Sequence, residues 1–262
     1  MDSHYDLHLH LNERLNDLGG RIKLAEHMGW DGLCCTVDFQ STEVLREFSE
    51  KISDMRKKTK IALFSGAEIT AKSAQELRKN SRKALSFVDI ILIKGGSDEI
   101  NRSATECWEV DILCHPEKLA KKDFMKQKNS GIDHVMAKLM AERLIGIEFN
   151  FSEILNSYGM LRSQILGRMR QNVILARKYN ALMVLTSGAQ DKWGSRAPRE
   201  LLAIGRILGM NQGEAKLAVS ENPSRILQKS KDRKDPNIIL KGLEVMEWGD
   251  QKPQKKKMYG WY

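Results

Sequence analysis

The sequence predicts an α/β fold, namely a TIM-like (β/α) barrel with about seven parallel strands. Seven short strand-like runs are mostly separated by helical patterns, and strands that alternate with helices form parallel sheets. Several of these runs are continuously apolar, as expected for strands covered on both faces. The chain of 262 residues also suits a single α/β barrel. A doubly wound open sheet is the alternative architecture.

The expected strands share an apolar run that stops at a polar residue or a glycine. They are Tyr5–Leu11, Gly32–Val37, Ile61–Ile69, Val88–Lys94, Val110–Cys114, Leu144–Phe149 and Ala181–Thr186. Polar and apolar residues alternate in the first strand, so Asp6, His8 and His10 share one face. In a barrel the carboxyl ends of all strands meet at one rim, where functional sites lie.

Capping and amphipathic patterns mark the helices between these strands. Met160–Tyr179 carries an amphipathic stripe, and Pro198–Leu208 has proline in its first turn and Gly209 after its end. Four further helix starts are expected from capping residues, at Ser73, Ser103, Asn211 and Asn222.

The composition indicates a basic protein whose cysteine thiols are reduced. Lysine and arginine number 43 against 34 acidic residues, which gives a formal net charge of +9 and favours a polyanionic partner, nucleic acid before membrane. The four cysteines have no C-x-x-C spacing, so reduced thiols and a cytoplasmic location are expected. No signal-peptide pattern and no long apolar run occur, so no membrane span is expected.

Two lysine-rich segments lie outside the strand and helix pattern. Residues 1–230 are expected to form the barrel, and residues 231–262 a basic C-terminal extension that ends in the lysine-rich tail Gln251–Tyr262. Lys118–Lys128 holds five lysines and follows the fifth strand, so it should hang over the rim.

Polar residues at the strand ends form a candidate metal site. They are Asp6, His8, His10, Asp38, Glu68, His115, Glu148 and Asn150. Histidine and carboxylate ligands suit zinc, manganese or iron, and such an ion could activate water for phosphoester hydrolysis. A polar rim without a metal is the alternative interpretation.

Basic residues near the strand ends form a candidate phosphate-binding set. Lys94 and Arg102 follow the fourth strand, and Lys192 and Arg196 follow the seventh. Arginine contacts phosphate in a bidentate manner, lysine contacts it as a point charge, and Trp193 could stack on an unpaired base. A helical basic group comprises Arg78, Lys79, Arg82 and Lys83. For each residue singly, a solvated charge is the alternative.

An ordered series of short motifs resembles the archaeal ribonuclease P protein component 3 family, relatives of the thirty-kilodalton subunit of eukaryotic ribonuclease P. The resemblance covers roughly residues 5 to 228. Its motifs are Gly95-Gly96, Asn101-Arg102, Val110–Pro116, Leu185–Ala189, Ser195–Leu201, Leu208-Gly209 and Ser220–Leu227.

The resemblance implies a barrel related to the polymerase-and-histidinol-phosphatase (PHP) superfamily of metal hydrolases. His8, His10, Glu68 and His115 match positions where PHP enzymes place metal ligands. Ser187-Gly188-Ala189 stands where those enzymes carry a late Asp-x-His pair, which implies a vestigial site. No tightly bound cofactor is therefore expected, although the RNA of the holoenzyme requires magnesium.

The resemblance also implies a role in tRNA maturation. In that family the RNA subunit cleaves the 5′ leader from precursor tRNA, and the protein supports the RNA together with component 2 and other ribonuclease P proteins. The isolated chain is then noncatalytic and meets precursor tRNA only indirectly. RNA contacts are expected from Lys94, Arg102, His115, Lys192, Arg196, Arg82 and Arg177.

Two other functions stay open on the sequence. One is a PHP-type metal-dependent phosphoesterase that uses His8, His10, Glu68 and His115. The other is a structural adaptor whose main surface binds proteins.

Overall fold

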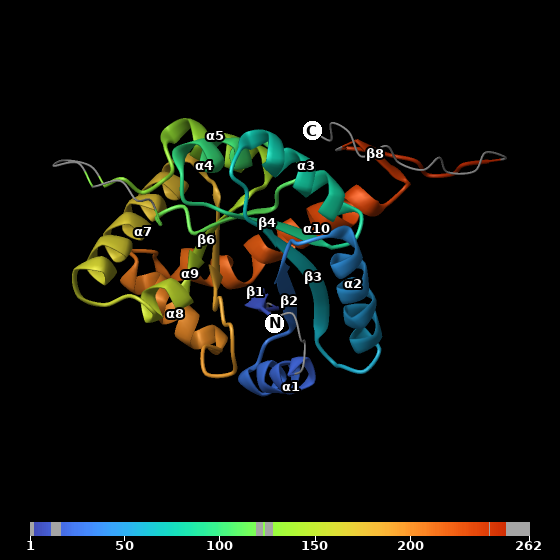
Figure 1. The fold of residues 1–262 in the computed structure, drawn as a ribbon, viewed down its shortest axis with the longest axis horizontal. Helices are drawn as coiled ribbons and strands as arrows, with labels where there is room; N and C mark the ends of the chain where they lie inside the picture. The colour runs from blue at the N-terminus through green and yellow to red at the C-terminus, as the bar shows by residue number, and fades with distance from the viewer. Residues whose placement is uncertain (1–2, 12–16, 119–122, 124–127, 241, 250–262) are drawn as a thin grey trace.

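Seven parallel strands in the order β1 to β7 form a nearly closed barrel, which confirms the predicted fold class (Figure 1). The computed structural model describes residues 3–11, 17–118, 123, 128–240 and 242–249. The strands are β1 (Tyr5–His10), β2 (Gly32–Asp38), β3 (Ala62–Ile69), β4 (Ile90–Lys94), β5 (Ile112–Cys114), β6 (Gly146–Asn150) and β7 (Leu182–Thr186). All seven expected strands are present, with ends that differ by at most two residues from the expected ones.

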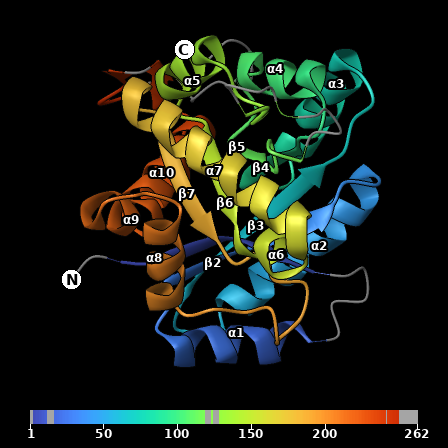
Figure 2. The same ribbon diagram turned by 90° about the vertical axis from the view of Figure 1, so that its left-hand side faces the viewer.

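Helices connect the strands and surround the barrel (Figure 2). They are α1 (Leu18–Met28), α2 (Thr42–Arg56), α3 (Ala74–Leu85), α4 (Asp98–Glu106), α5 (His134–Arg143), α6 (Phe151–Leu155), α7 (Gly159–Tyr179), α8 (Pro198–Ile207), α9 (Gln212–Val219) and α10 (Glu221–Lys234). A short antiparallel hairpin, β8 (Ile238–Leu240) with β9 (Leu243–Glu244), follows α10. The sequence patterns did not predict this hairpin.

Two of the four expected helix starts are confirmed. The Ser73 hydroxyl accepts the backbone N–H of Glu76 at 3.2 Å, and Asn211 caps α9 by accepting the N–H of Glu214 at 2.8 Å. Each cap satisfies a backbone donor that the first helical turn leaves without an intrahelical partner.

The other two expected starts are wrong. Ser103 lies inside α4, which begins earlier because Ser97 caps it and Asp98 occupies its first turn. Asn222 lies inside α10, and its side-chain amide donates to the Met183 carbonyl at 2.8 Å. In both places a second polar residue upstream supplies the actual N-terminus, Ser97 for α4 and Ser220 for α10.

The buried side chain of Arg21 bridges the gap between β1 and the end of β7. β1 forms an isolated bridge, between Leu9 and Ala189, with the segment that follows β7, and the His10 N–H donates to the Ala189 carbonyl at 3.0 Å. Arg21 of α1 donates to the carbonyls of His10 at 2.6 Å and Ala189 at 2.5 Å. The guanidinium therefore supplies donors where a continuous ladder of backbone hydrogen bonds would otherwise close the barrel.

The amino end of the barrel is closed by α10. Figure 1 shows this helix passing behind the strands and running out to the hairpin. Ile226 and Leu227 join the apolar interior formed by strand residues such as Leu7, Leu92 and Val184. The helix thus completes the core as well as covering it.

Charged residues hold α10 in place. Arg233 donates to both oxygens of Asp111 at 2.8 Å, and Lys229 lies 3.2 Å from the same carboxylate. Burial alone would raise the pKa of Asp111, but Arg233 and Lys229 outweigh it and lower that pKa. α10 continues four residues past the expected domain boundary at 230. The division of the chain into these two parts stays a prediction.

The structure also bears on the expectations for the cysteines, for membrane spans and for the lysine-rich segments. The four cysteines are buried free thiols. Among the described residues, no helix has both the length and the apolar character needed to cross a membrane. The tail Gln251–Tyr262 and, within the lysine-rich segment, Lys121, Lys122 and Lys126 lie outside the described residues.

Candidate functional site

Histidines and carboxylates from several strands converge at the carboxyl rim of the barrel. Glu68 lies at their centre: its Oε2 is 3.4 Å from His10 Nδ1 and 3.8 Å from His8 Nε2. Its Oε1 is 3.9 Å from His115 Nε2, and His10 Nε2 is 3.6 Å from Asp38 on β2. The expectation that these strand ends bring their side chains together is confirmed for these five residues. The register of β1 shifts between Asp6 and Leu9, which interrupts the alternation expected to place Asp6 on the same face as His8 and His10.

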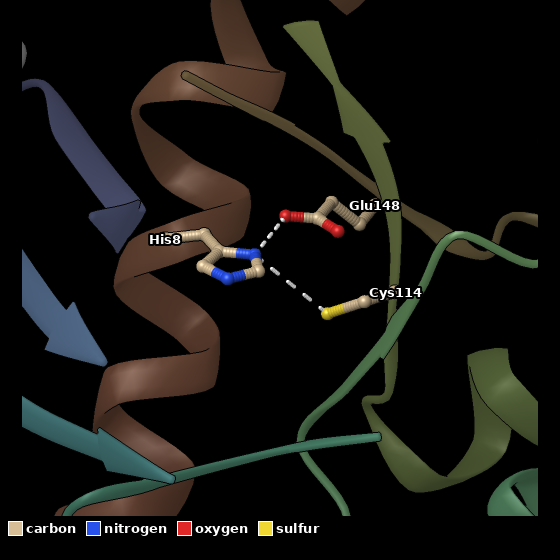
Figure 3. A group of neighbouring side chains, drawn as sticks. All are labelled: His8, Cys114 and Glu148. Carbon is tan, nitrogen blue, oxygen red and sulfur yellow. Dashed lines mark hydrogen bonds and ion pairs between the residues drawn. The ribbon is translucent and has the colours of Figure 1, made fainter. Parts of the chain in front are cut away.

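Glu148 binds His8 from the opposite side of the barrel (Figure 3). Its Oε1 lies 2.6 Å from His8 Nδ1 and also accepts the Thr186 hydroxyl at 2.6 Å and the Asn150 amide at 3.2 Å. Burial alone would lower the pKa of His8, but Glu148, then Glu68 and Asp6, raise it to about 9. A protonated His8 therefore balances the buried carboxylates at neutral pH.

The thiol of Cys114 lies in the same cluster without joining its charge network. Its Sγ is 3.9 Å from His8 Nδ1 (Figure 3). Burial, followed by the nearby Glu148 and Glu68 carboxylates, keeps the pKa of this thiol well above its ordinary value. Without a metal ion beside it, this thiol therefore stays protonated at neutral pH.

Three side chains of the rim, those of His8, His10 and Glu68, are close enough together to hold one cation. One ligand atom each from His8, His10 and Glu68 lies within 4.8 Å of the others, and Glu68 Oε1 is buried with no hydrogen bond to a described residue. A divalent ion held by these three residues would need His8 in its neutral form and would act as a Lewis acid toward a phosphate oxygen.

The rim has no late ligand pair at the position where PHP enzymes carry one. The backbone N–H of Ser187 donates to the Asp6 carboxylate, at 3.2 and 3.4 Å to its two oxygens. Gly188 and Ala189 offer no side-chain donor. The segment after β7 therefore uses backbone hydrogen bonds where a multinuclear centre would need an aspartate and a histidine, and a PHP-type phosphoesterase is not favoured.

Substituting Gly188 with alanine is expected to destabilise the protein by about 2–4 kcal/mol. Gly188 has φ +57°, and a Cβ there would lie 2.0 Å from Asn150 Oδ1, so the new methyl group must displace Asn150. Urea unfolding at pH 7 measures the effect. Gly209→Ala is the control, since Gly209 also has positive φ but a Cβ added there would meet no atom within 4 Å. Equal losses for both variants would show that contact with Asn150 is unimportant.

The structure divides the expected basic residues between two ends of the barrel. Lys94 is half-buried at the end of β4, where its charge helps to lower the pKa of Glu68. Arg82 and Arg177 occupy the last turns of α3 and α7, at the amino ends of the strands, and pair with Glu109 at 2.8 Å and Glu214 at 2.6 Å. These two arginines therefore do not share a face with the carboxyl rim.

Two further residues of the expected set are engaged by neighbours. Arg102 lies between α4 and α5, with Glu106 and Asp133 each at 3.3 Å. The side chain of His115 is only 7 % exposed and faces Glu153 at 3.5 Å as well as Glu68.

The segment after β7 gathers aromatic and cationic groups. The Arg196 guanidinium lies 4.8 Å from the Phe151 ring centroid, and Lys192 Nζ lies 5.0 Å from the Trp193 ring centroid. In the segment after β6, the Arg162 guanidinium lies 5.1 Å from the ring centroid of Tyr158. Sequence reasoning missed the partners Phe151 and Tyr158, because no local pattern joins them to these cations.

The fold and the rim together define a class of protein. It is a TIM-like barrel whose rim carries histidines and carboxylates of the kind found in hydrolases, and these pair mainly with one another. A loop with aromatic and cationic side chains lies beside them. The family model described as RNase P subunit p30 matches residues 3–235. The chain belongs to this family, which confirms the resemblance found in the sequence.

Curated relatives and a solved structure agree with this assignment. The chain is 33 % identical over 246 residues to ribonuclease P protein component 3 of Methanococcoides burtonii, covering 94 % of this chain and 95 % of the relative. It is 34 % identical over 231 residues to that of Methanosarcina barkeri, covering 87 % and 88 %. A chain in the cryo-EM structure of archaeal ribonuclease P with mature tRNA superposes with a TM-score of 0.77 at 29 % identity, covering 94 % of this chain and 100 % of that chain.

Proposed function

We propose that this chain is an RNA-binding protein subunit of ribonuclease P, which removes the 5′ leader from precursor tRNA. The observation that carries the proposal is family membership over residues 3–235. The partners are ribonuclease P RNA, protein component 2 and other ribonuclease P proteins. The RNA catalyses the cleavage with magnesium, and this chain contacts precursor tRNA only indirectly. The chain acts in the cytoplasm.

The charge of the chain supports RNA contact at the carboxyl rim. A formal net charge of +9 attracts a polyanion, and neutralised phosphates release counterions, so binding falls steeply with salt. Lys192, Arg196 and Lys94 at this rim are the first candidates for phosphate contact. Arg102, on α4, is a weaker candidate, because it already has two acidic partners, Glu106 and Asp133, each at 3.3 Å. Arg82, Arg177 and the buried His115 are weaker candidates, because acidic partners or burial limit their access.

The rim histidines support the noncatalytic part of the proposal. His8 Nδ1 is held by Glu148 at 2.6 Å, and the segment after β7 offers Ser187, Gly188 and Ala189 in place of further ligands. We propose that no cofactor is tightly bound and that the cluster stabilises the barrel.

Reconstitution with archaeal ribonuclease P RNA and component 2 tests the proposal. The purified chain alone should not cleave precursor tRNA in magnesium or manganese. Added with component 2, it should lower the magnesium concentration that the RNA needs for cleavage. A metal-loaded chain that hydrolyses phosphoesters alone, with activity lost in His10→Ala, would instead support the phosphoesterase.

Charge removal localises the contact. In Lys192→Gln the slope of log affinity against log salt should fall by about 1, because one phosphate contact is lost. Lys57→Gln is the matched control: Lys57 is 75 % exposed, but it follows α2 at the amino end of the barrel. The same slope for both variants would move the RNA contact away from the β7–α8 segment.

A further inference from the structure

Trp193 is an exposed aromatic ring on a backbone that is held in place. The residue is 77 % exposed, whereas Phe151, which stacks with Arg196 of the same loop, packs against the core. Leaving an indole in water forgoes the free energy of burying it, on the order of 2 kcal/mol for a large apolar side chain. Such a ring is typical of a surface that binds something.

Hydrogen bonds hold the backbone that carries this ring. Asp191 Oδ1 accepts the backbone N–H groups of Trp193 at 2.8 Å and Gly194 at 2.9 Å. Arg196 donates to the Trp193 carbonyl at 2.8 Å, while its guanidinium lies over Phe151. The Arg196 carbonyl accepts the indole N–H of Trp30, itself buried, at 2.9 Å. The loop is thus anchored to Trp30, between α1 and β2, and to Phe151 of α6, and binding at Trp193 needs little ordering of its backbone.

The loop that carries the ring holds two cations and one acid. Lys192 Nζ lies 5.0 Å from the Trp193 ring centroid, and Arg196 lies three residues further along the loop. The nearby acid, Asp191, is occupied by the two backbone N–H groups that form the turn. An aromatic face beside a cation matches a nucleotide, whose base stacks while its phosphate meets the cation.

We propose that Trp193 is a stacking platform for one unpaired base of RNA, with Lys192 contacting an adjacent phosphate. This inference deepens the proposed RNA-binding function and rests on it. A bound protein partner is the other occupant that an exposed indole could serve. The observations favour RNA, because a protein contact would not need the cation beside the ring. The base must be unpaired, because duplex RNA offers no exposed base face.

Chemical probing and affinity measurements on the assembled complex test the platform. Full-length wild type, Trp193→Ala, Trp193→Phe and Lys192→Gln are each combined with ribonuclease P RNA and component 2. Trp193→Ala should weaken RNA binding roughly 5- to 150-fold at fixed salt and leave the salt slope unchanged, because the ring carries no charge. Trp193→Phe should recover most of this loss. One base protected in wild type should become reactive in Trp193→Ala and protected again in Trp193→Phe.

Met160→Ala is the matched control, since Met160 is 80 % exposed and apolar but is not an aromatic ring. Its RNA affinity and footprint should equal those of wild type. If Lys192→Gln weakens RNA binding while Trp193→Ala binds as wild type does, the platform is excluded and the proposed function stands. If wild type itself fails to bind the RNA, the proposed function fails. If Trp193→Ala instead weakens binding to component 2 in the absence of RNA, the indole serves a protein interface and the inference is overturned.

Discussion

Replacing Asp111 with alanine is expected to lower the free energy of unfolding by about 3–5 kcal/mol. The Asp111 carboxylate is fully buried and lies within 2.8 Å of two guanidinium nitrogens of Arg233 and 3.2 Å of Lys229 Nζ. It also accepts the Ile91 backbone N–H at 2.9 Å. Alanine would leave Arg233 and Lys229, both largely buried, without this anion at the closed end of the barrel.

Urea unfolding followed by circular dichroism at pH 7 measures this loss. Asp54→Ala is the control, because Asp54 is 70 % exposed and lies 3.5 Å from Lys57 in a surface pair, whose loss should cost less than about 1 kcal/mol. Asp111→Asn separates charge from shape, since the amide oxygen can still accept the Ile91 N–H. Similar losses for Asp111→Ala and Asp54→Ala would show that this network does not hold α10 against the barrel.

The strands and the composition of the rim were predictable because both are local properties of the sequence. A strand covered on both faces must be apolar along its length, so runs such as Ile90–Lys94 stand out without knowledge of their neighbours. In a parallel barrel the strand ends meet at one rim, which is why His8, Glu68 and His115 could be grouped before their distances were known.

The contacts that close the barrel could not be predicted, because their partners are far apart in the chain. Asp111 and Arg233 are separated by 122 residues, and Arg21 and Ala189 by 168. Each of these charged residues looks like an ordinary surface residue in the sequence. Their burial follows from how α1 and α10 dock, which no periodicity specifies.

The sequence alone contains a signal that places Arg82 and Arg177 at the amino ends of the strands. A helix that follows a strand of a parallel barrel runs back, so its last turn lies at the amino ends of the strands. Arg82 and Arg177 both occupy last turns. Helix direction was therefore a signal that separates them from Lys192 and Arg196, although RNA contact by any of these four residues stays a prediction.

Stability is expected to fall as the pH rises from about 6.5 to about 9, through loss of the proton on His8. The folded-state pKa of His8 is raised from 6.5 to about 9, so the folded protein holds this proton more tightly than the unfolded chain. The resulting stabilisation is complete below pH 6.5 and is lost by about pH 9. It is on the order of 3 kcal/mol, from 1.36 kcal/mol per pKa unit. Glu148 has the opposite sign: its pKa is lowered, so its contribution is present above pH 4.5 and is lost in acid.

Glu148→Gln isolates this contribution. Glutamine can keep the contacts with Thr186 and Asn150 but supplies no charge to His8, so the variant should be less stable at pH 6 by about 2–3 kcal/mol. Its decline between pH 6.5 and 9 should be much shallower than that of wild type. Urea unfolding across pH 5–9.5, with a chelator present to remove any cation, gives both quantities.

The double variant His8→Gln with Glu148→Gln completes the thermodynamic cycle. If the pair is the source of the pH dependence, adding Glu148→Gln to His8→Gln should change the slope between pH 6.5 and 9 very little. A wild-type slope that persists unchanged in both single variants would assign the dependence to other groups. His8 would then be neutral, and its Nδ1 contact with Glu148 would be an ordinary hydrogen bond. No charge on His8 would then balance the buried carboxylates of the barrel.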